Sequence, residues 1–441
     1  MKLSRGSRHL AKRRGWVFSR FAASESMISF NRRSSQVLNS FGSLEGKSAP
    51  EAAVTARGKS FRRAIYLDAN ATTAPLAPVV EAVSEAMRSG MGNPASAHAS
   101  GAAARRSLEV ARDQISRLIG VVDADSITFV SGGTEANNTV IGSFVRDSTK
   151  TFLVAEIEHP SVIEPLRSWC PDRVLWTRVD SSGRIDPDEA RKKAQEARGP
   201  VALLLQTANS ETGVIQPVEQ IVEAVRSVRP DAFVHLDAAQ GAGRIRLDGY
   251  ASYVDTLCFS GHKIHGPLGT GVLAIRDGSN LRPLMLGGGQ ERGLRSGTPN
   301  LPGLVGLGVA ARIRTETFDR ANDHMRRLRD EFESAVLDGH HGRVQVNGKQ
   351  ALRVPNTSNL RFRDVDGMQL LANLDAAGVM ASQGSACSSG RPEPSRVLRA
   401  MGLTEREAFS SLRFSFSVLN TDLDAREAAD IVNSVVGKIG R

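Results

Sequence analysis

One lysine of this chain stands in a setting that suggests covalent chemistry. Lys263 follows the apolar run 256–259 within a polar, glycine-bounded turn that also carries Ser260 and His262. A buried lysine is costly unless its pKa is lowered or its amine is used covalently, and the main covalent use is a Schiff base with an aldehyde cofactor. A lysine at an exposed strand end fits the same residues, so this segment alone leaves both interpretations open.

Two other side chains suit a ring-shaped cofactor. Asp237 ends the apolar run 233–236, where a carboxylate could keep a pyridine nitrogen protonated so that the ring withdraws electrons. His159 follows the run 151–155 and could stack on a flat cofactor or move protons. Either residue could instead cap a helix, and His159 could also be a core histidine.

Two segments suit the recognition of anionic groups. In residues 131–138 (SGGTEANN), Gly133 and Thr134 stand where a predicted strand meets a predicted helix, and the backbone amides and dipole of a helix start favour phosphate. A simple capped turn explains the same segment. Arg413 alternates with apolar neighbours, as in a half-buried strand, where a guanidinium suits bidentate binding of a carboxylate. Its alternative place is the solvent face of a strand.

The chain has three cysteines, and one of them lies in an unusual setting. Cys387 is surrounded by small polar residues and glycines over 382–391, which predicts an accessible loop. Reactive cysteines are exposed, whereas structural cysteines prefer apolar surroundings. We therefore predict a reactive thiol at Cys387 and structural roles for Cys170 and Cys258. The spacing matches neither a metal site nor a disulfide framework.

Six short apolar runs must position these groups. They lie at 126–130, 151–155, 201–205, 233–236, 256–259 and 271–275, and segments of helix length such as 217–228 separate most of them. This pattern indicates a mainly parallel sheet covered on both faces. Polar groups follow most of these runs, and in such sheets ligands bind beyond the carboxyl ends of the strands. The sequence therefore predicts an α/β fold with a site along one edge of its sheet.

Charge and composition divide the chain into three parts. Residues 1–63 hold 14 Lys/Arg against 3 Asp/Glu, whereas residues 64–441 are nearly neutral. We predict a basic extension over 1–63, a large domain over 64–317 and a smaller α+β domain over 318–441. The neutral body argues against stable nucleic-acid binding. No apolar run reaches the roughly 20 residues that a membrane helix needs.

The basic extension has the composition of an import signal. It is rich in Arg, Ser and Ala, poor in acidic residues, and lacks the apolar core of a secretory signal. We predict import into an organelle, most simply the mitochondrion. If the extension is not a transit peptide, the protein is expected in the cytosol.

Taken in order, the motifs of residues 64–441 resemble those of the class V aminotransferase family and, within it, the cysteine desulfurases. The matching segments include YLDANATT, SGGTEANN, NSETG, HLDAAQ, SGHKIHGP, GGGQERGLRSGT, PNTSN, GSACSSG and SLRFSFS. Each motif is modestly specific, but all of them in one order are highly specific. The resemblance implies the type I fold of pyridoxal-phosphate-dependent transferases, with a large cofactor-binding domain and a smaller C-terminal domain.

The resemblance also implies a role for each candidate residue. Lys263 would bond covalently to pyridoxal phosphate, Asp237 would pair with its pyridine nitrogen, and His159 would stack on its ring. Asn209 and Gln240 would lie near its phenolic oxygen. The phosphate would be bound by Gly133, Thr134, Ser260 and His262. Thr298 would reach the phosphate of the neighbouring subunit, which implies a homodimer.

The implied reaction removes sulfur from L-cysteine and releases L-alanine. Arg413 would bind the substrate carboxylate with Asn209 nearby, and Lys263 would move the α-proton. Cys387 would attack the substrate sulfur and carry it as a persulfide to an acceptor protein. That acceptor could serve iron–sulfur cluster assembly or tRNA thiolation. Cys387 could transiently ligate a cluster during transfer, and no other metal site is expected.

Two kinds of alternative fit parts of the sequence. Selenocysteine lyase belongs to the same family and uses the same cofactor, but the loop after Cys387 is closer to that of the desulfurases. A non-catalytic scaffold would have been indicated by loss of Lys263 or Cys387, and both are present. A tRNA-binding module built on residues 1–63 would predict RNA binding that is sensitive to salt.

Overall fold

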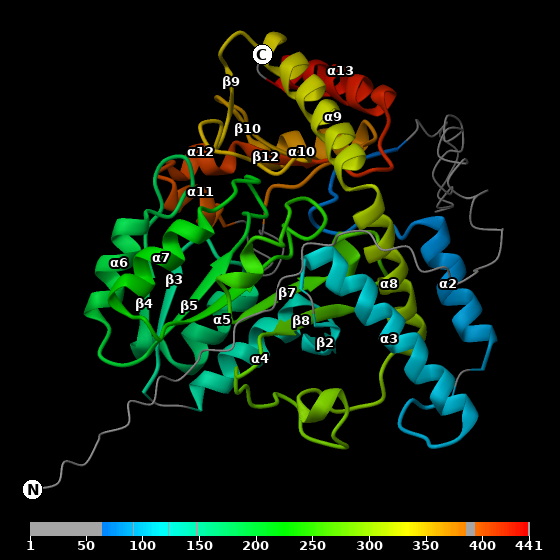
Figure 1. Ribbon diagram of the computed structural model, residues 1–441. Helices are drawn as coiled ribbons and strands as arrows, with labels where there is room; N and C mark the ends of the chain where they lie inside the picture. Colours follow the sequence, from blue (N-terminus) through cyan, green and yellow to red (C-terminus); the bar gives the residue numbers. More distant parts are fainter. Residues whose placement is uncertain (1–63, 91, 122, 147–148, 385–392, 440–441) are drawn as a thin grey trace, which may run out of the picture.

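The computed structural model describes residues 64–90, 92–121, 123–146, 149–384 and 393–439. The predicted basic extension and Cys387 lie outside these residues. Within them, a large body contains a central sheet, and a smaller group of helices and strands from the C-terminal part of the chain lies against one end of it (Figure 1).

The central sheet has seven strands in the order β2-β8-β7-β6-β5-β3-β4. Only β8 runs antiparallel to its neighbours, β2 and β7, and the other neighbouring pairs are parallel. The prediction of an α/β fold with a mainly parallel sheet is therefore confirmed. The strands are β2 (Ile127–Val130), β3 (Thr151–Ala155), β4 (Val174–Thr177), β5 (Val201–Gln206), β6 (Phe233–Asp237), β7 (Thr256–Ser260) and β8 (Gly271–Ile275).

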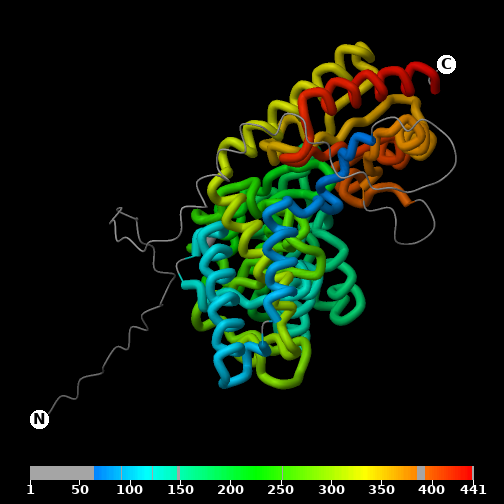
Figure 2. Tube along the Cα trace, turned by 90° about the vertical axis from the view of Figure 1, so that its right-hand side faces the viewer, coloured from blue at the N-terminus to red at the C-terminus, as the bar shows by residue number. Residues whose placement is uncertain are grey.

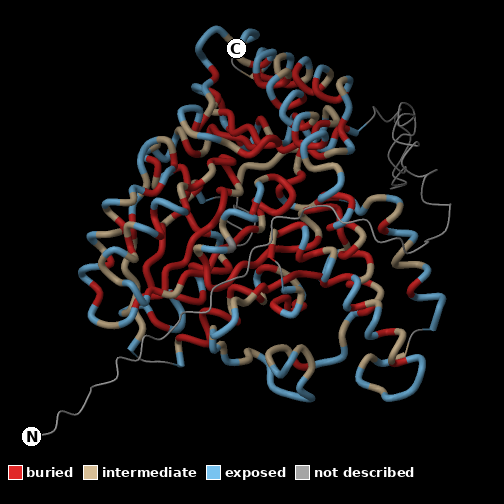
Figure 3. Tube along the Cα trace, in the orientation of Figure 1, coloured by how far each residue is buried: buried red, intermediate tan, exposed pale blue. Residues whose placement is uncertain are grey.

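Helices cover both faces of this sheet (Figure 1). Alternate side chains of a strand point to opposite faces, so Leu203 and Leu205 of β5 join one apolar cluster while Ala202 and Leu204 join another. The second cluster includes residues of α4 (Gly133–Val145) and α5 (Pro160–Trp169). The first includes residues of the helices on the other face: α2 (Ala77–Arg88), α3 (Ala99–Ile119), α6 (Pro187–Glu196), α7 (Val218–Val228) and α8 (Leu301–Glu316). Figure 3 shows the buried residues gathered along the central strands.

The C-terminal part is built on a three-stranded antiparallel sheet in the order β12-β10-β9. Its helices α9 and α13 pack side by side along one side of it, as Figure 2 shows. Its elements are α9 (Phe318–Asp338), β9 (Val344–Val346), β10 (Thr357–Phe362), α10 (Gly367–Ala376), β11 (Val379–Met380), α11 (Arg396–Ala400), α12 (Glu405–Phe409), β12 (Ser411–Ser415) and α13 (Asp422–Ile439).

The first described residues belong to the apolar core of this C-terminal part. Strand β1 (Ile65–Tyr66) pairs in parallel with β11, and Ile65 and Leu67 are buried in the same cluster as Phe332 and Phe414. Figure 2 shows this segment, in blue, running beside the orange C-terminal elements. The chain then enters the large body at α2. The segment around residues 67–72 therefore lies at the junction of the two parts, where the candidate site is found.

The described residues contain no helix that is both long and apolar enough to cross a membrane. They also contain no group of three or more His, Cys, Asp or Glu side chains placed to hold a metal ion. Cys170 and Cys258 are buried free thiols, in agreement with the structural roles predicted for them.

Candidate active site

The candidate site lies at the carboxyl ends of the parallel strands, on the side of the sheet that faces the C-terminal part. Asp237 ends β6, and Lys263 ends η5 (Gly261–Lys263), the short 3-10 helix that follows β7. His159 precedes α5, which follows β3. The charges of Asp237 and Lys263 act on the pKa of His159, and that of Asp237 acts on the pKa of Lys263, so the structure brings the three residues together.

The amine of Lys263 is held in an unusual environment. It donates hydrogen bonds to the backbone carbonyls of Asn70 and Ala71, the latter at 2.7 Å. Burial, with the positive charges of Arg244 and Arg413, lowers the pKa of Lys263 to about 7, although Asp68 and Asp237 act in the opposite direction. A large fraction of this amine is therefore neutral at physiological pH, as nucleophilic attack on an aldehyde requires.

Both oxygens of the Asp237 carboxylate accept hydrogen bonds from fixed donors. Oδ1 accepts from the backbone N–H of Ala239 at 2.8 Å, and Oδ2 accepts from the side-chain amide of Asn137 at 2.9 Å. The other end of the Asn137 amide, Oδ1, lies 2.8 Å from Nε2 of the fully buried His235. Because burial lowers the pKa of His235 to about 4, its ring is neutral and Nε2–H is the donor to Asn137. The carboxylate is thereby fixed in one orientation.

The same amide also connects Asp237 to His159. Asn137 Nδ2 donates to Ser161 Oγ at 2.8 Å, and Ser161 Oγ lies 2.8 Å from His159 Nδ1. Nδ1 also accepts from the backbone N–H of Ser161, so it carries no proton and Nε2 does. His159 therefore caps α5, which was the alternative interpretation, and its ring still remains exposed at the site. The surrounding protein removes much of the water around the His159 imidazole, and this desolvation lowers the pKa of His159.

The predicted phosphate-binding groups meet where β2 leads into α4. The backbone N–H of Gly133 donates to Ser260 Oγ at 2.8 Å, which joins the first turn of α4 to the end of β7. Gly132 and Gly271 pack so closely that a Cβ atom added to Gly271 would lie 2.5 Å from the Cα atom of Gly132. Thr134 is exposed in the first turn of α4, where a helix dipole favours an anion.

The other three predicted positions for the cofactor's polar groups are also near the site. His262 Nδ1 lies 3.1 Å from Thr72 Oγ1, and burial with the adjacent Lys263 lowers the pKa of His262 to about 4. Gln240 donates to the Asn70 carbonyl at 3.2 Å. Asn209 is buried, and its Oδ1 accepts hydrogen bonds from the backbone N–H groups of Glu211 and Thr212. The Oδ1 atom therefore stabilises the turn that follows Asn209.

Thr298 is not brought into contact with the other candidate residues. It is exposed on the segment that precedes α8. Its neighbours Gly297 and Pro299 line a shallow pocket with Ser131. Within the described part of this one chain, no hydrogen bond joins Thr298 to the groups that flank Lys263, so its predicted role depends on a second subunit.

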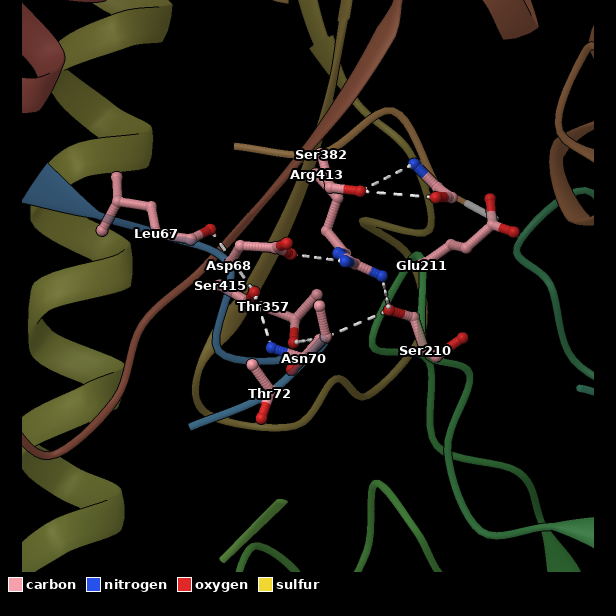
Figure 4. Close-up of polar contacts among 12 residues, drawn as sticks. Leu67, Asp68, Asn70, Thr72, Ser210, Glu211, Thr357, Ser382, Arg413 and Ser415 are labelled. Atoms are coloured by element: carbon pink, nitrogen blue, oxygen red, sulfur yellow. Dashed lines mark hydrogen bonds and ion pairs between the residues drawn. The ribbon is translucent and has the colours of Figure 1, made fainter. Parts of the chain in front are cut away.

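Arg413 lies on β12 and points toward the segment 68–72 and the loop that carries Ser210 (Figure 4). Its side chain is buried, donates to the Ser210 carbonyl at 3.0 Å, and forms an ion pair of 2.5 Å with Asp68. The guanidinium Nε is buried without a hydrogen-bond partner in the described structure. A guanidinium that already pairs with one carboxylate and has an unused donor is suited to a second carboxylate. The alternative, a solvent-facing arginine, is wrong.

Although Cys387 lies outside the described residues, both ends of its segment are described. Gly384 precedes the segment at a positive φ of 97°, and a Cβ atom there would lie 2.6 Å from Glu211 Oε2. Ser395 follows the segment, and its hydroxyl donates to the same carboxylate oxygen at 2.5 Å. Glu211 is adjacent to Ser210, the acceptor of Arg413. The chain that carries Cys387 therefore leaves and re-enters the described structure beside the candidate carboxylate site.

Several residues with roles at this site carried no signal of their own in the sequence. Asn137 and Asp68 act on groups distant in sequence, Asp237 and Arg413, and Ser161 joins the nearby His159 to the distant Asn137. The motifs of Asn137 and Asp68 were part of the resemblance, but residue type and spacing gave no reason to choose any of the three.

The sequence profile of the family described as Aminotransferase class-V matches residues 65–427. The chain belongs to this family. The resemblance inferred from the motifs is therefore confirmed.

Curated relatives and solved structures agree with this assignment. A cysteine desulfurase from Gluconacetobacter diazotrophicus is 40% identical over 382 residues, covering 85% of this chain and 94% of that protein. Cysteine desulfurase IscS 1 from Archaeoglobus fulgidus is 38% identical over 379 residues, covering 85% of this chain and 97% of its own length. Among solved structures, a NifS-like protein has a TM-score of 0.78 at 32% identity and covers 85% of this chain and all of its own. The NifS-like protein of Rickettsia africae has a TM-score of 0.77 at 29% identity, with coverage of 85% and 99%.

Proposed function

We propose that this protein is a pyridoxal-phosphate-dependent cysteine desulfurase. The observation that carries this proposal is Lys263, an amine with a pKa of about 7, placed near the fixed carboxylate of Asp237 and within electrostatic range of Arg413. These groups supply a nucleophilic amine, a partner for a cationic ring and a site for an α-carboxylate. The 40% identity with a cysteine desulfurase supports the choice of substrate.

The described residues fit pyridoxal phosphate. Lys263 would bind its aldehyde, Asp237 would pair with the ring nitrogen, and the exposed ring of His159 would stack on its open face. The first turn of α4 with Ser260 would receive the phosphate. When bound, the cofactor would supply an electron sink for the pair released from the substrate α-carbon.

Each step then uses a side chain of the protein. Arg413 orients the substrate through its carboxylate, and Lys263, once its amine is free, takes the α-proton. The thiolate of Cys387 attacks the substrate sulfur, so that a sulfur–sulfur bond forms while the bond between the β-carbon and sulfur breaks, and the β-carbon keeps the electron pair of that bond and takes up a proton. The products are L-alanine and a persulfide on Cys387, whose terminal sulfur passes to a thiol of an acceptor.

Three finer points belong to this proposal. A homodimer, in which Thr298 reaches the neighbouring subunit's phosphate, is supported by the exposure of Thr298 on the segment before α8. A sulfur-acceptor protein, such as a scaffold for iron–sulfur assembly or a tRNA-thiolation protein, is supported by the small polar residues and glycines around Cys387, which predict an accessible loop. Mitochondrial import is supported by the composition of residues 1–63.

The proposed activity is tested by alanine release from purified protein with pyridoxal phosphate and a thiol reductant. L-cysteine and L-selenocysteine are compared as substrates, with D-cysteine as the control for non-enzymatic release. We expect turnover of L-cysteine, and of L-selenocysteine as well because a selenol ionises more readily than a thiol. Turnover of L-selenocysteine alone would replace the proposal with selenocysteine lyase, and turnover of neither would exclude both.

The lowered pKa of Lys263 predicts how cofactor capture depends on pH. Capture needs the neutral amine, whose fraction rises as pH increases through about 7 and is nearly constant above that value. The rate at which cofactor-free protein binds pyridoxal phosphate covalently should therefore rise up to ~10-fold per pH unit below pH 7 and level off above it. Stopped-flow absorbance between pH 5.5 and 9.5 measures this rate. A rate that continues to rise to the upper limit would indicate an ordinary lysine.

A further inference from the structure

Two buried arginines next to Lys263 lack a carboxylate partner within the described structure. Arg244, in the segment after β6, is 7% exposed, and Arg314, near the end of α8, is 3% exposed. Neither forms a salt bridge with any described carboxylate, although most other arginines of the body do. Buried charges are normally paired, because an uncompensated charge in a protein interior costs free energy.

The existing contacts of both guanidinium groups are with neutral dipoles. Arg244 donates to the side chain of Gln240 and, at 3.4 Å, to the backbone carbonyl of Lys263. Arg314 donates to the Gly243 carbonyl and, at 3.2 Å, to Asn322 Oδ1. Its Nη1 is buried and has no hydrogen-bond partner in the described structure. These dipoles solvate the two cations without neutralising them.

Both side chains line one small cavity between the large body and the C-terminal part. Its volume of about 10 Å³ is close to what one water-sized particle needs, so the cavity suits a small monoatomic ligand better than a larger one. Lys263, His265 and Thr73 also line it. The Nδ1 atom of His265 lies 2.8 Å from the Ala74 carbonyl, so this ring is fixed, and burial together with Arg314 and Arg244 lowers its pKa to about 4. No described carboxylate lines the cavity.

The positive field of this region is strong enough to affect neighbouring groups. Burial and the charges of Arg314 and Arg413 lower the pKa of Arg244 to about 9, and burial lowers the pKa of Arg314 to about 10. Arg244 also contributes to the lowered pKa of Lys263. Asp68 and Asp237 act on the pKa of Lys263 in the opposite sense, and neither of them lines this cavity.

We propose that this cavity binds one chloride ion between Arg244 and Arg314. A monoatomic anion matches the room that is available, accepts a hydrogen bond from Nη1 of Arg314, and balances part of the charge of two guanidinium groups. A water molecule would fill the same space but would leave that charge uncompensated. The site is separate from the α4 start, where the phosphate of the cofactor is expected.

The first test compares the thermal stability of the full-length, cofactor-loaded protein in sodium chloride and in sodium gluconate at one ionic strength. Chloride binds only the folded protein in this proposal, so Tm should increase with chloride concentration by on the order of 2 °C and then level off. Arg314→Met should remove the difference between the two salts. Arg329→Met is the matched control, because Arg329 is also buried but pairs with Asp330, and this variant should keep the chloride effect.

A second measurement does not depend on how the variants fold. Crystals of the wild-type protein soaked in sodium bromide should show an anomalous peak within hydrogen-bond distance of Arg314 Nη1 and near the guanidinium of Arg244. A water molecule at that position, or a peak only at other places, would overturn the proposal. Bromide bound in the crystal without any difference between chloride and gluconate in solution would mean binding at crystal concentration only, and would also overturn it.

Discussion

Replacing Lys263 with alanine should reduce the turnover of L-cysteine by at least ~100-fold, because one side chain both binds the cofactor aldehyde and moves the α-proton. The amine is positioned for these tasks by the carbonyls of Asn70 and Ala71 and has a pKa of about 7. No other described lysine lines this part of the sheet edge. The measurement is single-turnover alanine formation, with cofactor content determined separately from absorbance.

The Lys263→Ala variant should keep part of its cofactor affinity. Asp237, held by Asn137 and Ala239, and the start of α4 are unchanged, so pyridoxal phosphate should bind without the covalent bond. Lys263→Arg is the matched control, because it keeps a positive charge but cannot become neutral at physiological pH. Turnover by either variant close to the wild-type rate would show that another group performs the chemistry.

Replacing Cys387 with alanine should abolish sulfur release from L-cysteine, to below ~1% of the wild-type rate, because no other thiol can reach the substrate sulfur. The two remaining cysteines are buried, and burial raises the pKa of both Cys170 and Cys258. Each is therefore a poor nucleophile. Sulfide and alanine are measured together, and the persulfide is identified by mass after alkylation.

Cys170→Ser is the matched control for this experiment, because it removes a thiol buried in the apolar cluster of α4 and α5 and should leave turnover unchanged. The same Cys387→Ala variant also separates the two family activities. If it still released alanine from L-selenocysteine at the wild-type rate, selenium removal would not need this thiol. If it still released alanine from L-cysteine, Cys387 would lose its proposed role.

The strands could be predicted from the sequence because apolar runs in a buried parallel sheet have a clear signature. The runs at 151–155 and 271–275 coincide with β3 and β8, and the others differ by a residue or two at their ends. Strand β4 was missed. It is an edge strand whose first three residues are only partly buried, and Arg173 and Arg178 flank it, so its apolar signal is short and weak.

The candidate site was predicted where one residue type carries the chemistry by itself. Lys263, Asp237 and Arg413 are examples, since an amine, a carboxylate and a guanidinium have few equivalents. Asn137 and Asp68 could not be chosen in this way, because their roles depend on partners 100 and 345 positions away in the chain. Such pairings form only when distant segments of the chain are brought together by the fold, and residue type and spacing do not specify which segments meet.

The short segment that follows the basic extension has a consequence for any proteolytic maturation of this protein. Within six residues, Leu67 is buried in the C-terminal core, Asp68 holds Arg413, and the carbonyls of Asn70 and Ala71 hold the amine of Lys263. A peptidase that cuts at or before residue 63 leaves all of these contacts intact. A cut only ten residues later would remove Leu67, which packs in the C-terminal core. It would also remove the hydrogen-bond and ion-pair partners of Lys263 and Arg413. Any enzyme that processed this chain would therefore have to cut before this segment, and activity should be lost abruptly once trimming passes residue 67.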